Sequence, residues 1–363
     1  MKFFNLDLHI SVIADIKYIL EEMGHSVTSW SISDHSWVFG RKSDRVDIVN
    51  QRTWRSIDTK MCEEFYNRYR EELKEYDAFI VTYMSSFSML YEKFGKPIIV
   101  VSPTRYEYPL SNSKERWEIF NRFLQKGIDE KTIIPLANNR YDAAYAEYFT
   151  QRQWAVIPSL CLYTKAQYTG KRNKFLWWSK FKQIPHVKDV ADKDTVLKRP
   201  FYRIFESGYR WQDAADFKGI AHIPYNASVM SIFEQYSADI PLFFPSFDFL
   251  KRLRGEFYRQ GVLSELSFNQ VMGYPPFSVL GPHDGKDPNR YDDNEVMMEW
   301  VKLADYYDEK TMPHITYFES FEDLKDILHT ADLSSISHQM ESANRKKKEL
   351  VFLEWEKVIK SLA

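Results

Sequence analysis

The sequence predicts an α/β protein that is built from two doubly wound domains. Two observations carry this prediction. The chain has 363 residues, which is too long for one ordinary hydrophobic core and fits two domains of common size. Short apolar runs typical of buried strands also alternate with amphipathic helical segments, and a polar stretch interrupts this alternation near the middle of the chain.

The first strand, helix and strand establish the pattern. Residues 2–8, KFFNLDL, form an apolar run that predicts a strand. Residues 11–24 carry apolar side chains at helical spacing, with Ser11 as the expected N-cap and Gly24 as the expected stop. Residues 25–32, HSVTSWSI, predict the second strand because they contain β-branched side chains. This succession is a βαβ unit, which builds a parallel sheet.

The same alternation continues through the first half of the chain. Further helices are expected at 59–76, 86–95, 113–127 and 139–150, and further strands at 77–83, 96–103, 132–138 and 154–160. We therefore expect a first doubly wound domain that spans residues 1–165.

A second alternation follows a polar stretch at 163–174, YTKAQYTGKRNK, which predicts a linker. Strands are expected at 175–181, 202–206, 219–224, 240–246 and 314–318, and helices around Glu234, at 295–309 and at 319–328. The stretch 269–294 is rich in Pro, Gly, Asp and Asn and predicts a surface loop. These elements indicate a second domain at 173–345, followed by a C-terminal helix at 346–363.

Composition excludes several classes of protein. The net charge of −2 is not that of a protein held by nucleic-acid phosphates. The two cysteines, Cys62 and Cys161, form neither a disulfide framework nor a zinc site, and they suit a reducing compartment. The sequence has no apolar run long enough to span a bilayer, so we expect a cytoplasmic protein. The basic stretch NRKKKE at 344–349 allows at most a weak contact with an anionic membrane surface.

Common nucleotide-binding and metal signatures are also missing from the sequence. It has no P-loop, and no G-x-G-x-x-G follows the first strand. The acidic residues of the surface loop do not have the spacing of an EF-hand, so we expect no metal site. That set contains His283, Asp284, Asp287, Asp292 and Asp293.

The stretch 222–246 and the C-terminal elements suggest a family. In 222–246 a serine, Ser228, precedes a helix, Glu234 lies on that helix, and Pro241 and an apolar strand follow. The chain resembles the GT-B superfamily of nucleotide-sugar glycosyltransferases over nearly its whole length. The resemblance implies two Rossmann-like domains that face each other across a cleft, with a last helix that crosses back to the first domain. The glycine that the family usually has before the proline is absent here.

The resemblance implies that the second domain binds the nucleotide-sugar donor. Glu234 would accept hydrogen bonds from the ribose hydroxyls, as a carboxylate can. Tyr225, Asn226 and Ser228 would lie near a helix start, where backbone N–H groups and the helix dipole attract phosphate.

Two basic residues before this stretch, Arg210 and Lys218, are candidates for neutralising the diphosphate. We prefer the arginine because its planar guanidinium matches phosphate.

The first domain would bind the acceptor. Ligands of parallel sheets meet the loops beyond the carboxyl ends of the strands, and His9 follows the first strand directly. An imidazole can take a hydroxyl proton near neutral pH, and in inverting members of the superfamily a histidine in this loop is the general base. In a retaining enzyme His9 would instead contact a substrate. Asp34, His35 and Trp37, after the second strand, are further acceptor-side candidates.

We expect an enzyme of class EC 2.4 that transfers a hexose or deoxyhexose from a nucleoside diphosphate to a glycan or another hydroxyl acceptor. No metal or other cofactor is expected, and a UDP donor and a GDP donor both stay open, as does the stereochemical outcome. Two alternatives remain. One is a nucleotide-sugar epimerase or polyol-phosphate transferase of the same fold, and the other is a non-catalytic two-domain protein that binds carbohydrate or another ligand.

Overall fold

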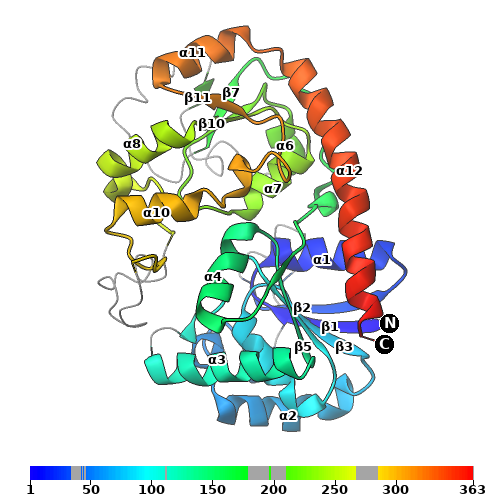
Figure 1. The fold of residues 1–363 in the computed structure, drawn as a ribbon. Coiled ribbons are helices and arrows are strands. Elements are labelled where there is room, and N and C mark those ends of the chain that lie inside the picture. Colours follow the sequence, from blue (N-terminus) through cyan, green and yellow to red (C-terminus); the bar gives the residue numbers. More distant parts are fainter. Residues whose placement is uncertain are drawn as a thin grey trace. The chain divides into compact units, whose positions relative to one another are not determined.

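Figure 1 shows the computed structural model of the chain. The structure describes residues 1–33, 42, 44, 46–110, 113–178, 196–197, 210–266 and 285–362. Asp34, His35 and Trp37 lie outside these residues, as do the strand expected at 202–206 and His283 and Asp284. By their contacts the described residues form two compact units. The first comprises the described residues of Met1–Ser159 together with those from Leu350 onward, and the second comprises the described residues from Leu160 to Glu349.

The first unit contains a sheet of six parallel strands in the order β2-β1-β3-β4-β5-β6. The strands are β1 (Lys2–Asp7), β2 (Ser26–Ser31), β3 (Ala78–Val81), β4 (Ile98–Ser102), β5 (Ile133–Ala137) and β6 (Ala155–Val156). The strand order reverses between β1 and β3, and a ligand of such a sheet binds beyond the carboxyl ends at this switch point. The doubly wound sheet predicted for the first half is thus confirmed.

Helices connect these strands, as Figure 1 shows for α1 to α4. They are α1 (Ile10–Glu22), η2 (Trp54–Ser56), α2 (Thr59–Leu73), η3 (Ser85–Phe94), α3 (Lys114–Asp129) and α4 (Arg140–Thr150). The expectation that Ser11 caps α1 is wrong. The N-cap is His9, whose carbonyl accepts from the Ile13 N–H at 3.2 Å, because the chain enters the helix directly after β1. Gly24, at φ +83°, follows the end of the helix as predicted.

The second unit contains five parallel strands in the order β11-β10-β9-β7-β8. The strands are β7 (Phe175–Trp178), β8 (Val196–Leu197), β9 (Ile220–His222), β10 (Leu242–Pro245) and β11 (Thr316–Phe318). Taken from β8, this is the unit's second, first, third, fourth and fifth strand, which matches the order of the first five strands of the other unit. Its switch point lies between β7 and β9.

Helices alternate with the strands of the second unit as expected, although two of the α-helices, at Trp211–Ala215 and Phe247–Phe257, are not predicted from the sequence. The helices are η5 (Leu162–Thr164), α6 (Trp211–Ala215), α7 (Met230–Ser237), α8 (Phe247–Phe257), η7 (Tyr258–Gln260), α10 (Asn294–Val301), η8 (Asp305–Tyr307) and α11 (Phe321–Thr330). The stretch expected to be a linker is packed on this unit instead. The Tyr168 hydroxyl donates to the Lys218 carbonyl at 2.8 Å, and the Thr169 hydroxyl donates to Asp216 at 2.9 Å.

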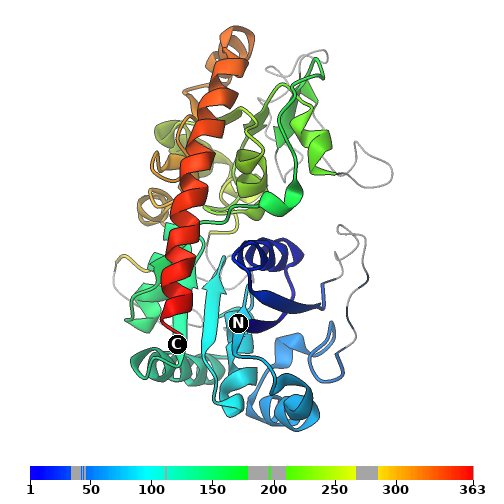
Figure 2. The same ribbon diagram turned by 90° about the vertical axis from the view of Figure 1, so that its right-hand side faces the viewer.

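The chain ends in one long helix, α12 (Leu333–Lys360), which Figure 2 shows as a continuous red ribbon. It begins before the predicted start at residue 346. Asp332 precedes it and accepts from the Ser335 N–H at 3.0 Å, and no proline or glycine interrupts the residues that follow. Its last part, from Leu350 onward, groups with the first unit. No helix in the described part of the chain is both long and apolar enough to span a bilayer.

Aromatic side chains make up much of the first unit's core. Phe79 on β3 stacks on Tyr91 of η3 with ring centroids 4.3 Å apart, and Phe4 of β1 meets both rings edge-on. Each side chain of this kind contributes about 1.5–3 kcal/mol when it is fully buried. The core therefore fixes the sheet whose carboxyl edge carries the polar residues described next.

Candidate functional site

Asp7, the last residue of β1, lies at the switch point of the first sheet. Its buried carboxylate accepts four backbone N–H groups, from Leu8 at 2.7 Å, Thr82 at 2.7 Å, Tyr83 at 2.8 Å and Met84 at 3.1 Å. Burial raises the pKa of the carboxyl group, and the four donors act against that rise. Asp7 therefore ties the end of β1 to the loop that follows β3.

His9 lies two residues beyond Asp7, at the start of α1. Its ring centroid is 4.9 Å from that of Tyr83, with the ring planes inclined by 35°. The imidazole is half-buried, and its Nδ1 atom is turned into the protein. The predicted base thus lies at the carboxyl edge of the sheet, beside the loop that Asp7 holds.

A second polar group follows β4 and β5 at the same edge. The Tyr145 hydroxyl donates to Glu107 Oε1 at 2.7 Å, and Asn139 Nδ2 donates to Asp142 Oδ2 at 2.6 Å. Burial raises the pKa of Glu107 to about 7 and that of Asp142 to about 6, while the charge of Arg105 opposes both rises. The arrangement holds a guanidinium and two carboxyl groups that titrate near neutrality.

Sequence reasoning missed this second group, although a signal was present. Arg105 and Glu107 closely follow one predicted strand, and Asn139 and Asp142 closely follow the next. The rule that selected His9, that ligands meet the carboxyl ends of parallel strands, selects these residues as well.

The carboxyl edge of the second sheet carries an aromatic row. Trp178 at the end of β7 stacks on Trp211 at the start of α6, with ring centroids 6.5 Å apart and planes inclined by 22°. The ring centroid of Trp178 also lies 6.2 Å from that of His222, the last residue of β9. Trp178 and Trp211 are both partly exposed, so aromatic side chains reach the surface at this edge of the sheet.

His222 itself is a buried, neutral member of this row. Its ring stacks on Phe244 at 4.5 Å, and its Nε2 lies 2.6 Å from Gln235 Oε1. Burial lowers the pKa of His222 to about 3, and the hydrogen bond to Gln235 Oε1 opposes this shift. A neutral imidazole N–H can donate to the amide oxygen, so the pair fixes α7 to β9.

Three predicted donor-site residues lie in the loop between β9 and α7, at this same edge. Tyr225 and Asn226 hold the loop through their carbonyls, which accept from the Glu265 N–H at 2.9 Å and from the Tyr306 hydroxyl at 3.2 Å. Ser228 precedes the N-cap of α7, which is Val229. Because valine cannot cap a helix, the first N–H groups of α7 receive no hydrogen bond from the side chain at that position.

Glu234 is on α7, as predicted, but its carboxylate is turned inward. It is 2% exposed, and its Oε1 accepts a short hydrogen bond from the Tyr163 hydroxyl of η5. A contact with a ribose would have to coexist with this bond or replace it.

The structure separates the two basic candidates. Arg210 is the exposed N-cap of α6, whose next residue, Trp211, stacks on the carboxyl end of β7. Lys218 precedes β9 and lies at the opposite, amino-terminal edge, with its Nζ 6.0 Å from the ring of Phe175. Only Arg210 is therefore on the same side of the sheet as the loop after β9.

The acidic stretch expected as a surface loop is partly buried. Asp287 and Asn289 have no exposed surface, and Asp293 caps α10 by accepting from the Glu295 and Val296 N–H groups at 3.1 Å. Within the described residues, no cluster of His, Cys, Asp and Glu has the arrangement of a metal site.

Comparisons with known proteins gave structural matches. No protein-family model matches the sequence, and no curated protein matches it. The chain is similar to a solved structure of the glycotransferase of kitacinnamycin, with 10% identity and a TM-score of 0.48, over 100% of this chain and 99% of that chain. It is also similar to the glycosyltransferase SnogD from Streptomyces nogalater, with 13% identity and a TM-score of 0.46, over 100% and 99% of the two chains.

A further match is Staphylococcus aureus MnaA, solved with UDP, at 13% identity and a TM-score of 0.40 over 86% of this chain and 94% of that chain. Glycosyltransferases are thus among the solved structures that this chain resembles along its full length.

Proposed function

We propose that the protein is a glycosyltransferase of GT-B type that moves a sugar from a nucleoside diphosphate to a hydroxyl acceptor. One observation carries the proposal: two units repeat the same parallel strand order, and each has functional groups at the carboxyl edge beside its switch point. The first unit offers an imidazole and titratable carboxyl groups, and the second offers an aromatic surface and a helix start. The first set suits proton transfer, and the second suits binding of a nucleotide.

In the proposed reaction, His9 acts as the general base toward the acceptor. Since Nδ1 is turned into the protein, Nε2 would take the proton from the acceptor hydroxyl. The acceptor oxygen then bonds to the anomeric carbon, the bond from that carbon to the phosphate oxygen breaks, and the nucleoside diphosphate leaves. The configuration at the anomeric carbon would be inverted.

The second unit would hold the donor. The nucleobase would stack on Trp178 and Trp211, and the diphosphate would meet the N–H groups at the start of α7 and the guanidinium of Arg210. Glu234, one turn further along α7, would accept from the ribose. Arginine and helix N–H groups can balance the leaving diphosphate, so the proposed chemistry uses no metal or other cofactor.

The donor nucleotide and sugar are tested by incubating the protein with UDP-, GDP-, CDP- and dTDP-linked hexoses and deoxyhexoses. Slow release of nucleoside diphosphate from one donor, accelerated by an acceptor glycan, is the expected result. Conversion of the donor to an epimer would favour the epimerase alternative. Saturable sugar binding with no turnover of any donor would overturn the proposal in favour of a binding protein.

A further inference from the structure

We propose that the outer face of α12 docks the protein on an anionic lipid surface. The surface concerned is a stripe of five residues, Lys346, Leu350, Leu353, Lys357 and Lys360, which we call the α12 stripe. The proposal concerns a surface that no step of the proposed sugar transfer uses, so it stands independently of that function.

Two exposed leucines form the centre of the stripe. Leu350 is 63% exposed and Leu353 is 53% exposed, whereas the other large hydrophobic side chains exposed in the described residues, Met1 and Ile119, reach only 38%. Scattered exposed leucines are ordinary on a protein surface. Here the two most exposed ones lie three residues apart on one helix.

Helical geometry gathers the five residues on one face. Their offsets from Lys346 are those of successive turns of a helix, so their side chains line up along α12. The opposite face holds the helix in place, because Met340, Val351 and Trp355 are at most 2% exposed. The α12 stripe is therefore the side that the fold leaves to solvent.

The part of α12 that carries the stripe has a positive net charge, whereas the whole chain has a negative one. Residues 345–360 contain six basic and three acidic side chains, although the complete chain has a net charge of −2. Lys347 is drawn inward over the rings of Phe233 and Tyr236, at 5.3 and 5.4 Å. Arg345, Lys346 and Lys348 are exposed. Of these three, Lys346 lies on the α12 stripe, and clustered basic groups attract anionic headgroups.

Two lysines of the stripe already have partners on the helix. Lys357 pairs with Glu354 at 2.6 Å, and Lys360 pairs with Glu356 at 2.8 Å. Exposed pairs of this kind are weak, so a lipid phosphate can compete with the glutamates for the ammonium groups.

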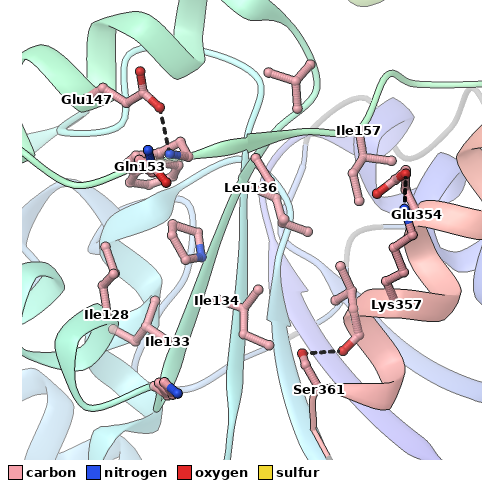
Figure 3. A pocket seen from close by; sticks show the side chains of 16 residues that line it. Ile128, Ile133, Ile134, Leu136, Glu147, Gln153, Ile157, Glu354, Lys357 and Ser361 are labelled. Carbon is pink, nitrogen blue, oxygen red and sulfur yellow. Dashed lines mark hydrogen bonds and ion pairs between the residues drawn. The ribbon is translucent and has the colours of Figure 1, made fainter.

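An aliphatic groove runs beside the stripe, within the first unit (Figure 3). Its volume is about 660 Å³, and α12 forms one side of it through Glu354, Lys357, Val358 and Ser361. Ile134, Leu136 and Ile157 lie on the side of the sheet. Leu350 precedes Glu354, a lining residue of the groove, by one helical turn.

The combination favours lipid over other anionic partners. Leucines flanked by lysines on a helix are typical of segments that lie in a membrane interface, where the apolar groups enter the acyl boundary and the ammonium groups stay with the phosphates. A nucleic-acid backbone would leave the two leucines without an apolar partner.

Flotation of the full chain with vesicles tests the proposal. Vesicles of phosphatidylcholine with added phosphatidylglycerol are compared with vesicles of phosphatidylcholine alone. We expect binding to the first kind only, and it should weaken as salt is raised. The Leu350→Ser/Leu353→Ser variant should lose most of the binding. Each of Lys346→Gln and Lys360→Gln should lower the partition coefficient about five-fold.

Matched controls come from the same unit. Ile119→Ser removes another exposed aliphatic side chain, and Lys60→Gln removes a lysine whose side chain is 84% exposed. Both should bind as the unaltered chain does, and circular dichroism should show every variant folded. Absence of binding to anionic vesicles, equal binding to neutral ones, or equal losses in the controls would overturn the proposal. Binding to an acidic polypeptide or to RNA without binding to vesicles would also overturn it.

Discussion

The carboxylate of Asp7 accepts a hydrogen bond from the backbone N–H of Tyr83 at 2.8 Å, which joins two strand ends that are far apart in the sequence. The same carboxylate accepts three further backbone N–H groups, and the ring of Tyr83 lies beside His9. Asp7 therefore positions Tyr83 and the adjacent His9 in the proposed acceptor site, although it does not itself need to contact a substrate.

Asp7→Asn should lower both stability and turnover. An amide offers one acceptor oxygen where the carboxylate offers two, and its NH₂ would face backbone N–H groups. We expect a loss of about 2–4 kcal/mol in the free energy of unfolding, measured in urea, together with a fall in kcat. Asp77→Asn is the control, because Asp77 is an exposed carboxylate that accepts the backbone N–H of Lys2 at 2.7 Å. Equal stability of both variants would contradict this role for Asp7.

The contacts of Asp7 show where sequence reasoning ends. The apolar runs and helical spacings predicted all six strands of the first sheet and the strands of the second sheet other than β8, and the strand-end rule placed His9 at the carboxyl edge. Three of the four donors to Asp7 lie 75 to 77 residues away along the chain. No pattern of neighbouring residues predicts such a contact, because the contact forms only when β1 and β3 pair in the sheet.

The same limit explains the outcome for the second unit. The pattern of 222–246 predicted α7 and the strand after it, yet Glu234 meets Tyr163, which is 71 residues earlier in the chain. Lys218 was grouped with Arg210 because the two are close in sequence. They lie at opposite edges of the sheet because α6 lies between them in the sequence and Lys218 precedes the start of β9. The early start of α12 could have been predicted from Asp332 as a cap and from the lack of a helix breaker after it.

Glu107 should make the first unit less stable as the pH rises. Its pKa is raised from 4.5 to about 7, so the folded protein keeps a proton that the unfolded chain has released in this range. The contribution of Glu107 to the free energy of unfolding should be complete below pH 4.5. It should fall by about 3 kcal/mol as the pH rises to 7.

Glu107→Gln should flatten this part of the pH dependence. Glutamine keeps an acceptor oxygen for the Tyr145 hydroxyl and cannot titrate. Urea unfolding at several pH values between 4.5 and 7.5 would measure the effect, with the exposed Glu64→Gln as the control. A Glu107→Gln profile as steep as that of the unaltered chain would show that Glu107 is not the titrating group.

Glu234 and Tyr163 can be separated by two substitutions. Tyr163→Phe leaves a buried carboxylate without this donor, so it should lower Tm, with a cost of about 1–3 kcal/mol, while donor affinity is kept. Glu234→Gln should weaken donor binding about ten-fold or more if the carboxylate also accepts from the ribose. Isothermal titration with the nucleoside diphosphate measures the affinity of both variants, and thermal unfolding measures their Tm. If the two variants lose Tm equally and neither loses affinity, Glu234 only anchors η5.

The measurement that tests the central claim most directly is the turnover of the preferred donor and acceptor by His9→Ala. Loss of a general base typically lowers kcat by about 10²–10⁴-fold, and the donor Kd should stay unchanged because the donor is bound by the second unit. His338→Ala is the matched control, since this histidine lies on α12 with its side chain 77% exposed, and it should keep full activity. We expect the variant to retain donor binding and lose transfer. Full transfer activity in His9→Ala would contradict the account.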